Sequence, residues 1–271
     1  MLAREAGRGA PPFLTTITIL GSGTGVPWRG RAGPGWVAQI DALEADTVLV
    51  DPSAGSIQRM ADCGIPLERL THVLFSHYHP DHTGDLVPLL FALQNPRYHR
   101  QPRPLRLIGP RGLRKLLRDL AGVYGQWIET GERVELIELG GAEGANFAAV
   151  GPLEVTAHPV LHIEPSMAYR FASRGGGTFA YSGDTDRCDG AVDAARNADL
   201  LLAECSFPEG EKRLGHLTPS EVGRLAEAAG ARKVVLLHLY PECHGHDLVG
   251  PCREFFRGEV LVAQDGMVLS V

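Results

Sequence analysis

Short runs of apolar residues, bounded by glycine, proline and polar residues, recur along most of the chain. The runs are four to seven residues long, and several are rich in β-branched residues, which indicates strands. We predict strands over residues 15–20, 37–40, 47–50, 72–75, 105–108, 133–139, 153–157, 167–171, 178–182, 200–203 and 234–237.

Between these runs lie segments with helical character. We predict helices over residues 56–63, 86–93, 112–123, 190–197 and 219–229, the last with Thr218 as its N-cap. Many short strands with interspersed helices predict an α/β protein in which sheet layers are covered by helices. We find no internal repeat or linker in mid-chain, so residues 1–271 are expected to form one domain. Residues 1–12, rich in Gly, Pro and Arg, are expected to be frayed.

Composition narrows the class of protein. The 271 residues are 44% hydrophobic and 21% charged, which is typical of a globular chain with a sizeable core. The net charge of -6 argues against general attraction to nucleic acid or to an anionic membrane. No apolar run is long enough for a membrane span, and the N-terminal residues do not resemble a signal peptide. We therefore expect a cytoplasmic protein whose five cysteines are reduced.

A glycine-rich segment follows the first predicted strand. Residues 21–25 read Gly-Ser-Gly-Thr-Gly, which suggests a nucleotide-binding loop. The segment runs into Pro27 and Trp28 instead of opening an amphipathic helix. A tight turn between two strands is therefore the favoured interpretation.

The strongest chemical signal is a cluster of histidines directly after the apolar strand that ends at Phe75. Residues 77–82 read His-Tyr-His-Pro-Asp-His, an HxHxDH pattern. Imidazoles and carboxylates are common ligands of zinc and similar ions, and side chains two residues apart at a strand end converge on one point. The cluster therefore predicts a metal site.

Further ligands are expected where other strands end. His162, Asp184 and His238 each follow an apolar strand, which would bring them to the same rim as the cluster. His158 competes with His162, and strand parity does not separate two residues that are four apart.

In this order of motifs the chain resembles the metallo-β-lactamase superfamily over essentially its whole length. The resemblance implies a four-layer αββα sandwich with two divalent metal ions, zinc or alternatively manganese. It also favours His162 over His158, because the family's ligand shortly precedes a strand like the one containing Tyr169. By the family pattern one ion is held by His77, His79 and His162, the other by Asp81, His82 and His238, and Asp184 bridges the two.

Two further motifs resemble the phosphodiesterase branch typified by ribonuclease Z and the phosphonate-pathway cyclic phosphodiesterases. Glu204 stands in a segment like that branch's acidic motif, and His216 in one like its His-Ser-Thr motif, with Leu217 where Ser is usual. The resemblance implies hydrolysis of a phosphodiester by hydroxide that two metal ions generate. In this scheme Asp81 orients the hydroxide, and His216, backed by Glu204, protonates the leaving oxygen.

The expected substrate is a small phosphodiester or another anion, because two divalent ions with their carboxylates and a hydroxide leave a charge of about +1. Residues 97–118 contain seven arginines and one lysine, which either steer phosphate groups or form a solvated surface.

The RNA-gripping arm of ribonuclease Z does not fit into the 22-residue step from His162 to Asp184, so RNA is not the favoured partner. A lactone, thioester or β-lactam hydrolase is the alternative function, and a metal-stabilised binding protein the remote one. Membrane association is not expected, and homo-oligomer formation stays open.

Overall fold

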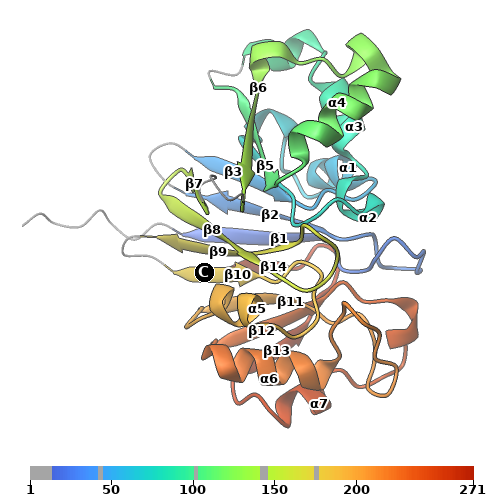
Figure 1. Ribbon diagram of the computed structural model, residues 1–271, viewed down its shortest axis with the longest axis vertical. Helices are drawn as coiled ribbons and strands as arrows, with labels where there is room; N and C mark the ends of the chain where they lie inside the picture. The colour runs from blue at the N-terminus through green and yellow to red at the C-terminus, as the bar shows by residue number, and fades with distance from the viewer. Residues whose placement is uncertain (1–13, 42–44, 101–102, 141–145, 174–176) are drawn as a thin grey trace, which may run out of the picture.

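A computed structural model describes residues 14–41, 45–100, 103–140, 146–173 and 177–271. Two mixed β-sheets of seven strands each lie at its centre (Figure 1). The first sheet has the order β14-β1-β2-β3-β4-β5-β6. Its strands are β1 (Thr15–Gly21), β2 (Gly35–Ile40), β3 (Asp46–Val50), β4 (His72–Leu74), β5 (Leu105–Pro110), β6 (Val134–Leu139) and β14 (Val268–Ser270).

The second sheet comes from the second half of the chain, in the order β13-β12-β11-β10-β9-β8-β7. Its strands are β7 (Phe147–Val150), β8 (Leu153–Pro159), β9 (Met167–Ser173), β10 (Thr178–Tyr181), β11 (Leu200–Glu204), β12 (Lys233–Leu237) and β13 (Glu259–Val262). Strands β10, β11, β12 and β13 pair in parallel, so their carboxyl ends meet at one edge of the sheet.

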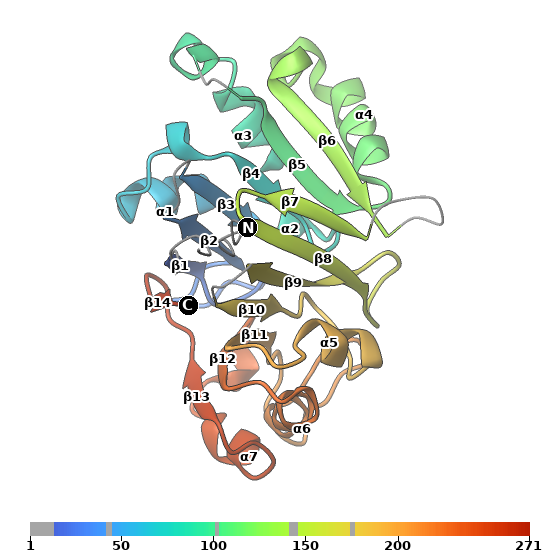
Figure 2. The same cartoon turned by 90° about the vertical axis from the view of Figure 1, so that its left-hand side faces the viewer.

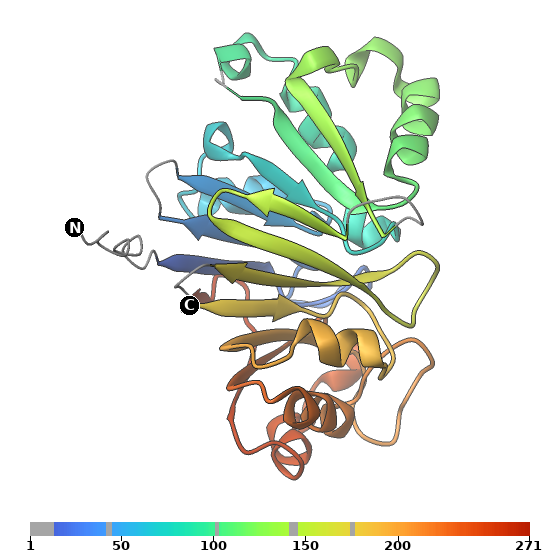
Figure 3. The same ribbon diagram turned by 60° about the vertical axis from the view of Figure 1, so that its left-hand side comes forward.

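Helices cover the outer face of each sheet, as the turned views in Figures 2 and 3 show. Those on the first sheet are α1 (Ser56–Asp62), α2 (Pro80–Thr83), α3 (Leu86–Ala92) and α4 (Leu113–Tyr124). Those on the second are α5 (Asp189–Ala194), α6 (Pro219–Ala229) and α7 (Val249–Arg253). Short 3₁₀ helices are η1 (Leu67–Arg69), η2 (Pro96–Arg100), η3 (Gly125–Trp127), η4 (Gly131–Arg133) and η5 (Pro241–Cys243). No helix in the described ranges has the length and apolar character that a membrane crossing requires.

Three buried apolar layers hold these four layers together. In β3 the side chains of Val48 and Val50 point into the layer between the sheets, whereas Leu49 packs under the helices. Strand β11 alternates in the same way, with Leu202 between the sheets and Leu201 under α5 and α6. Both faces of each sheet are therefore buried, which explains why the strands read as continuous apolar runs.

The expected αββα sandwich is confirmed, and most predicted strands and helices are present within a few residues. Three strands escaped the sequence analysis, namely β7, β13 and β14, which have only three or four residues each. The prediction of a tight turn after β1 is wrong, because the connection from β1 to β2 is a long loop over residues 22–34. The expectation of fraying concerns residues 1–12, which lie outside the described residues.

Candidate metal centre

The predicted ligands are brought together where strands of both sheets end. His77 follows β4, Asp184 follows β10 and His238 follows β12, while His162 lies in the loop after β8. His238 has a left-handed backbone (φ 58°), which non-glycine residues rarely adopt. Such backbone strain persists only where the surrounding structure fixes it, and it is typical of functional sites.

The HxHxDH segment changes conformation at its proline. His77 and His79 lie in the extended segment after β4, and Pro80 is the first residue of α2, a position where its missing N–H costs nothing. Asp81 and His82 follow within this single helical turn. The four side chains therefore reach two neighbouring positions.

Two groups of side chains have the spacing of metal ligands. The ligand atoms of His77, His79, His162 and Asp184 all lie within 4.8 Å of one another. The same holds for Asp81, His82 and His238. A third set, Asp184, His216 and His238, also has this spacing, but it takes Asp184 from the first group and His238 from the second.

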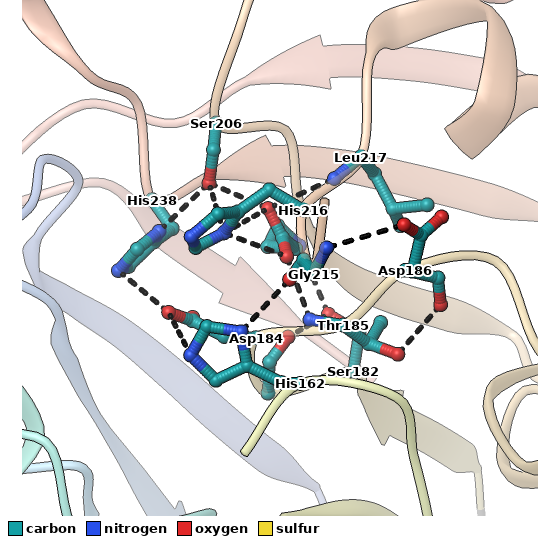
Figure 4. Close-up of polar contacts among 12 residues, drawn as sticks. His162, Ser182, Asp184, Thr185, Asp186, Ser206, Gly215, His216, Leu217 and His238 are labelled. Carbon is teal, nitrogen blue, oxygen red and sulfur yellow. Dashed lines mark hydrogen bonds and ion pairs between the residues drawn. The ribbon is translucent and has the colours of Figure 1, made fainter. Parts of the chain in front are cut away.

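Asp184 lies between the two groups. Its Oδ2 is 3.9 Å from His77 Nε2 and 3.8 Å from His162 Nε2 on one side. On the other side it is 3.4 Å from His82 Nε2 and 3.3 Å from His238 Nε2. Figure 4 shows this carboxylate beside His162 and His238. One carboxylate that touches both sets of imidazoles can bridge two ions.

Unpaired atoms at the centre fit a bound cation. Among the described residues, His77 Nε2 and Asp184 Oδ1 are buried without a hydrogen-bond partner. A buried polar atom without a partner is costly, and a metal ion would supply one to each.

The two ring nitrogens of His82 and His238 give a second argument. His82 donates Nδ1–H to Asp51 Oδ2 at 2.9 Å, and His238 donates Nδ1–H to Ser206 Oγ at 3.0 Å. When neutral, both rings then carry a lone pair on Nε2, yet these atoms lie 3.2 Å apart. A proton on the His82 Nε2 joins the two atoms in the metal-free protein, and a metal ion beside them would take the place of this proton, so the residues fit a metal ion.

Asp51 is the residue that the sequence analysis missed here. It is fully buried at the end of β3, with a left-handed backbone (φ 46°). Its carboxylate also accepts hydrogen bonds from Ser76 Oγ at 2.5 Å and from Tyr181 OH at 2.7 Å. Its position directly after a buried strand was the available signal, the same one that identified His238. Such second partners fix the orientation of ligand rings.

The Gly215 carbonyl and the Ser206 hydroxyl orient the rings of two candidate ligands, His162 and His238. His162 donates Nδ1–H to the carbonyl oxygen of Gly215 at 2.9 Å, which leaves Nε2 for a metal. The Ser206 hydroxyl accepts a hydrogen bond from His238 Nδ1–H and donates one to Glu204 Oε2 at 2.5 Å. The sequence analysis named neither group. A backbone carbonyl carries no sequence signal, and the only signal for Ser206 was its place two residues after Glu204.

Burial and neighbouring charges set the protonation states of the candidate ligands. Burial, together with His82, lowers the pKa of His77 to about 2, so this imidazole is neutral. Burial alone would raise the pKa of Asp184, but His238 and His82 hold it well below its usual range. At His82, burial lowers the pKa, but the charges of Asp184 and Asp51 outweigh burial, so the pKa of His82 is raised. Binding of an ion would therefore displace a proton from His82.

Glu204 and His216 form a pair beside the ligands. Glu204 is fully buried at the end of β11 and lies 3.2 Å from His216 Nδ1 through Oε1. Burial lowers the pKa of His216, but the hydrogen bond and charge of Glu204 outweigh it, so the pKa is raised. The His216 ring centroid is 4.9 Å from that of His162. An imidazole with a raised pKa thus lies next to the candidate ligands.

The glycine-rich loop after β1 also reaches the site. Gly25 N–H donates to Asp81 Oδ2 at 2.9 Å, and a Cβ on Gly25 would meet the Asp81 Cβ at 3.0 Å. This loop therefore holds a candidate ligand. His158, the competitor of His162, is in β8 with Nε2 3.2 Å from Thr156 Oγ1, and it belongs to neither group of candidate ligands.

Most of the basic stretch is paired with acidic side chains on the surface of the first half of the chain. Arg106 pairs with Glu135 at 2.8 Å, and Arg114 lies 3.8 Å from Glu138. Arg97 pairs with Glu68. These pairs favour the interpretation of a solvated surface for this part of the stretch.

Comparisons with known proteins show the family of the chain. Residues 46–239 match the family model of the beta-lactamase superfamily domain, and the chain belongs to this family. The predicted resemblance is thereby confirmed.

Three proteins show more closely what the chain is similar to. The chain is 28% identical over 265 residues to the "Probable metallo-hydrolase YhfI" of Bacillus subtilis, covering 93% of this chain and 98% of that one. The crystal structure of YhfI matches with a TM-score of 0.80 at 26% identity, covering 96% of this chain and 100% of YhfI. Ribonuclease Z of Thermobifida fusca is 26% identical over 309 residues, with 94% of each chain covered. A diphosphatase of the PhnP family shares the fold, with a TM-score of 0.69 at 20% identity and 95% and 97% of the two chains covered. Metallo-hydrolase relatives support hydrolytic activity.

Proposed function

We propose that this protein is a dinuclear metal-dependent phosphodiesterase. The observation that carries the proposal is the combination of two ligand groups, an Asp184 carboxylate within 4 Å of imidazoles from both, and the Glu204–His216 pair beside them. Ribonuclease Z and the PhnP-family diphosphatase, whose names indicate phosphoester substrates, support the substrate class.

His77, His79 and His162 would hold one ion, Asp81, His82 and His238 would hold the other, and Asp184 would be shared by both. Zinc suits this set of nitrogen and carboxylate ligands best, with manganese as the alternative. Two bound ions would supply a hydroxide nucleophile near neutral pH and positive charge for the phosphoryl oxygens.

The chain's own residues contribute positioning and a proton. Asp81, held by the Gly25 N–H, orients the attacking water. His216 directs Nδ1 to Glu204, which leaves Nε2 to protonate the oxygen of the departing alcohol. Glu204 fixes the ring and stabilises its charged form.

The substrate is a small diester rather than a tRNA precursor. Strands β9 and β10 take up most of the step from His162 to Asp184. By the resemblance to ribonuclease Z, an RNA-gripping arm would be inserted in this step. The paired arginines of residues 97–118 and the net charge of -6 offer little compensating field.

The test compares two diesters with different leaving groups. We expect His216→Ala to slow hydrolysis of a diester with a poor alkoxide leaving group by about 10² to 10⁴, because only that group needs a proton. Hydrolysis of bis(p-nitrophenyl) phosphate should fall much less. Steady-state rates on both substrates, with metal content measured in parallel, check this.

The outcomes separate the parts of the proposal. An equal loss on both diesters at unchanged metal content would show that His216 is not the proton donor. Hydrolysis of a lactone or thioester without any diesterase activity, in zinc or manganese, would replace the phosphodiester by an acyl substrate.

A further inference from the structure

A cavity of about 610 Å³ opens beside the candidate metal centre. His162 and Gly215 form its inner wall, and these residues are hydrogen-bonded to each other (Figure 4). The loop between β8 and β9, and Arg111 in the turn before α4, also line it. A substrate whose phosphoryl group lies at the metals would therefore extend one of its substituents into this cavity.

The outer wall of this cavity is apolar and exposed. Leu161 is 59% exposed, Ile163 37% and Leu214 92%, and all three line the cavity. Large apolar side chains gathered at the rim of a cavity are costly in water and typical of binding sites. They suit the flat or apolar face of an organic substituent such as a nucleoside.

Arg111 adds a positive charge to the lining of the cavity. It lies in the turn between β5 and α4, which Glu138 fixes by accepting hydrogen bonds from the N–H groups of Gly112 and Arg114 at 2.9 and 3.0 Å. Arg97, Arg106 and Arg114 of the basic stretch are paired. The exposed Arg111 side chain has no hydrogen bond or ion pair with any residue in the described ranges.

Two carboxylates also line the cavity. Asp186 is neutralised, because Lys212 Nζ lies 2.8 Å from its Oδ1 and the Gly215 N–H donates to its Oδ2. Glu164 is exposed in the β8–β9 loop. Arg111 is therefore a cation that a ligand in the cavity can contact. The negative charge of Glu164 would disfavour an anionic ligand there.

We propose that this cavity binds the organic substituent of the diester and that Arg111 recognises a second anionic group on it. This inference rests on the proposed phosphodiesterase function. The substrate class is then a phosphodiester whose nucleoside-like substituent carries a further phosphate or carboxylate. A guanidinium binds a phosphate through two parallel hydrogen bonds, which gives both affinity and orientation.

The test uses two esters with the same scissile bond. They are thymidine 5′-(p-nitrophenyl phosphate) and the same ester with a 3′-phosphate. In the unaltered protein the 3′-phosphate should lower KM about tenfold. Arg111→Gln should bring the ratio of the two KM values to about one, and Glu164→Gln should increase it. Arg118→Gln, an exposed arginine of α4 outside the cavity, is the matched control and should keep the tenfold ratio.

Binding provides a readout that does not need turnover. Calorimetry should show that thymidine 3′,5′-bisphosphate binds the unaltered protein more tightly than thymidine 5′-phosphate, and that Arg111→Gln removes the difference. Equal KM values for the two esters, or an equal loss with Arg111→Gln and Arg118→Gln, would overturn this inference and leave the diesterase proposal standing. Turnover of neither ester would overturn both.

Discussion

At the scale of single residues, Gly215 shows how a position without a side chain controls a metal ligand. Its carbonyl accepts the Nδ1–H of His162, and its backbone is left-handed (φ 81°). A Cβ at this position would meet His162 Nδ1 at 2.9 Å. The ring can keep its present place only while residue 215 is glycine.

Gly215→Ala should therefore weaken metal binding about 10 to 100-fold, the usual effect of disturbing a ligand's second partner. Gly210→Ala is the matched control, since Gly210 has a similar φ of 85° but nothing within 4 Å of the added methyl group. Both variants carry the backbone cost, and only the first touches His162. Competition with a chromophoric chelator measures the affinity, and an equal loss in both variants would contradict the role of Gly215.

At the scale of elements, strand β4 has a histidine at each end. His77 follows its carboxyl end, and His72 begins it, 3% exposed, with Nδ1 2.8 Å from Thr71 Oγ1 and 3.7 Å from Asp46. Burial outweighs the nearby Asp46 charge and lowers the pKa of His72 to about 4. The folded protein therefore holds this imidazole in its neutral form at neutral pH.

This lowered pKa makes stability depend on pH. In the unfolded chain the His72 pKa is about 6.5, so below that pH the unfolded state takes up the proton first. The free energy of unfolding should fall between pH 6.5 and pH 4, by at most about 3 kcal/mol from this residue. Urea unfolding of metal-free protein and of His72→Gln measures it. The variant should show a shallower fall, and parallel curves would contradict the assignment.

Helix α6 illustrates an element that could be predicted. Thr218 was expected as its N-cap, and its N–H donates to Glu221 Oε2 at 3.0 Å, with Pro219 at the first helical position. The signals are local in sequence, so they survive without knowledge of the fold. Strand β14 could not be predicted in this way, because its three residues form a strand only by pairing with β1.

At the scale of the whole molecule, the candidate ligands join the two halves of the chain. Residues 77–82 come from the half that forms most of the first sheet, whereas His162, Asp184 and His238 come from the second. An ion bound to both sets links the halves in the folded state and has no comparable site in the unfolded chain.

Removal of metal should therefore destabilise the protein. We expect two ions per chain by elemental analysis, and a loss of about 2.7 kcal/mol of unfolding free energy for each ion after chelation from a solution at about 100 times the Kd. Asp184→Asn should lower the metal content. A stoichiometry of one ion that Asp184→Asn leaves unchanged would exclude the dinuclear scheme.

The size of the substrate also depends on the whole molecule. We expect turnover of small diesters and weak, salt-sensitive or no 3′ trimming of tRNA precursors, because several phosphate contacts are needed to hold a large polyanion. A gel assay on a precursor tRNA measures this. Efficient cleavage that falls when Arg97 and Arg103 are changed to Ala would make the basic stretch an RNA-binding surface.

The sequence by itself indicated the family, the layer architecture and the candidate ligands. Apolar periodicity predicted sheet layers covered by helices, polar residues at strand ends predicted a metal site, and the resemblance to the metallo-β-lactamase superfamily implied the four-layer sandwich and the ligand sets. Tertiary structure decided which partners orient those ligands. Asp51 meets His82 from 31 positions away, and the Gly215 carbonyl meets His162 from 53 positions away. It also decided that Arg106 is paired while Arg111 faces the cavity. These contacts join residues distant in sequence or involve backbone atoms, and neither kind leaves a local pattern in the chain.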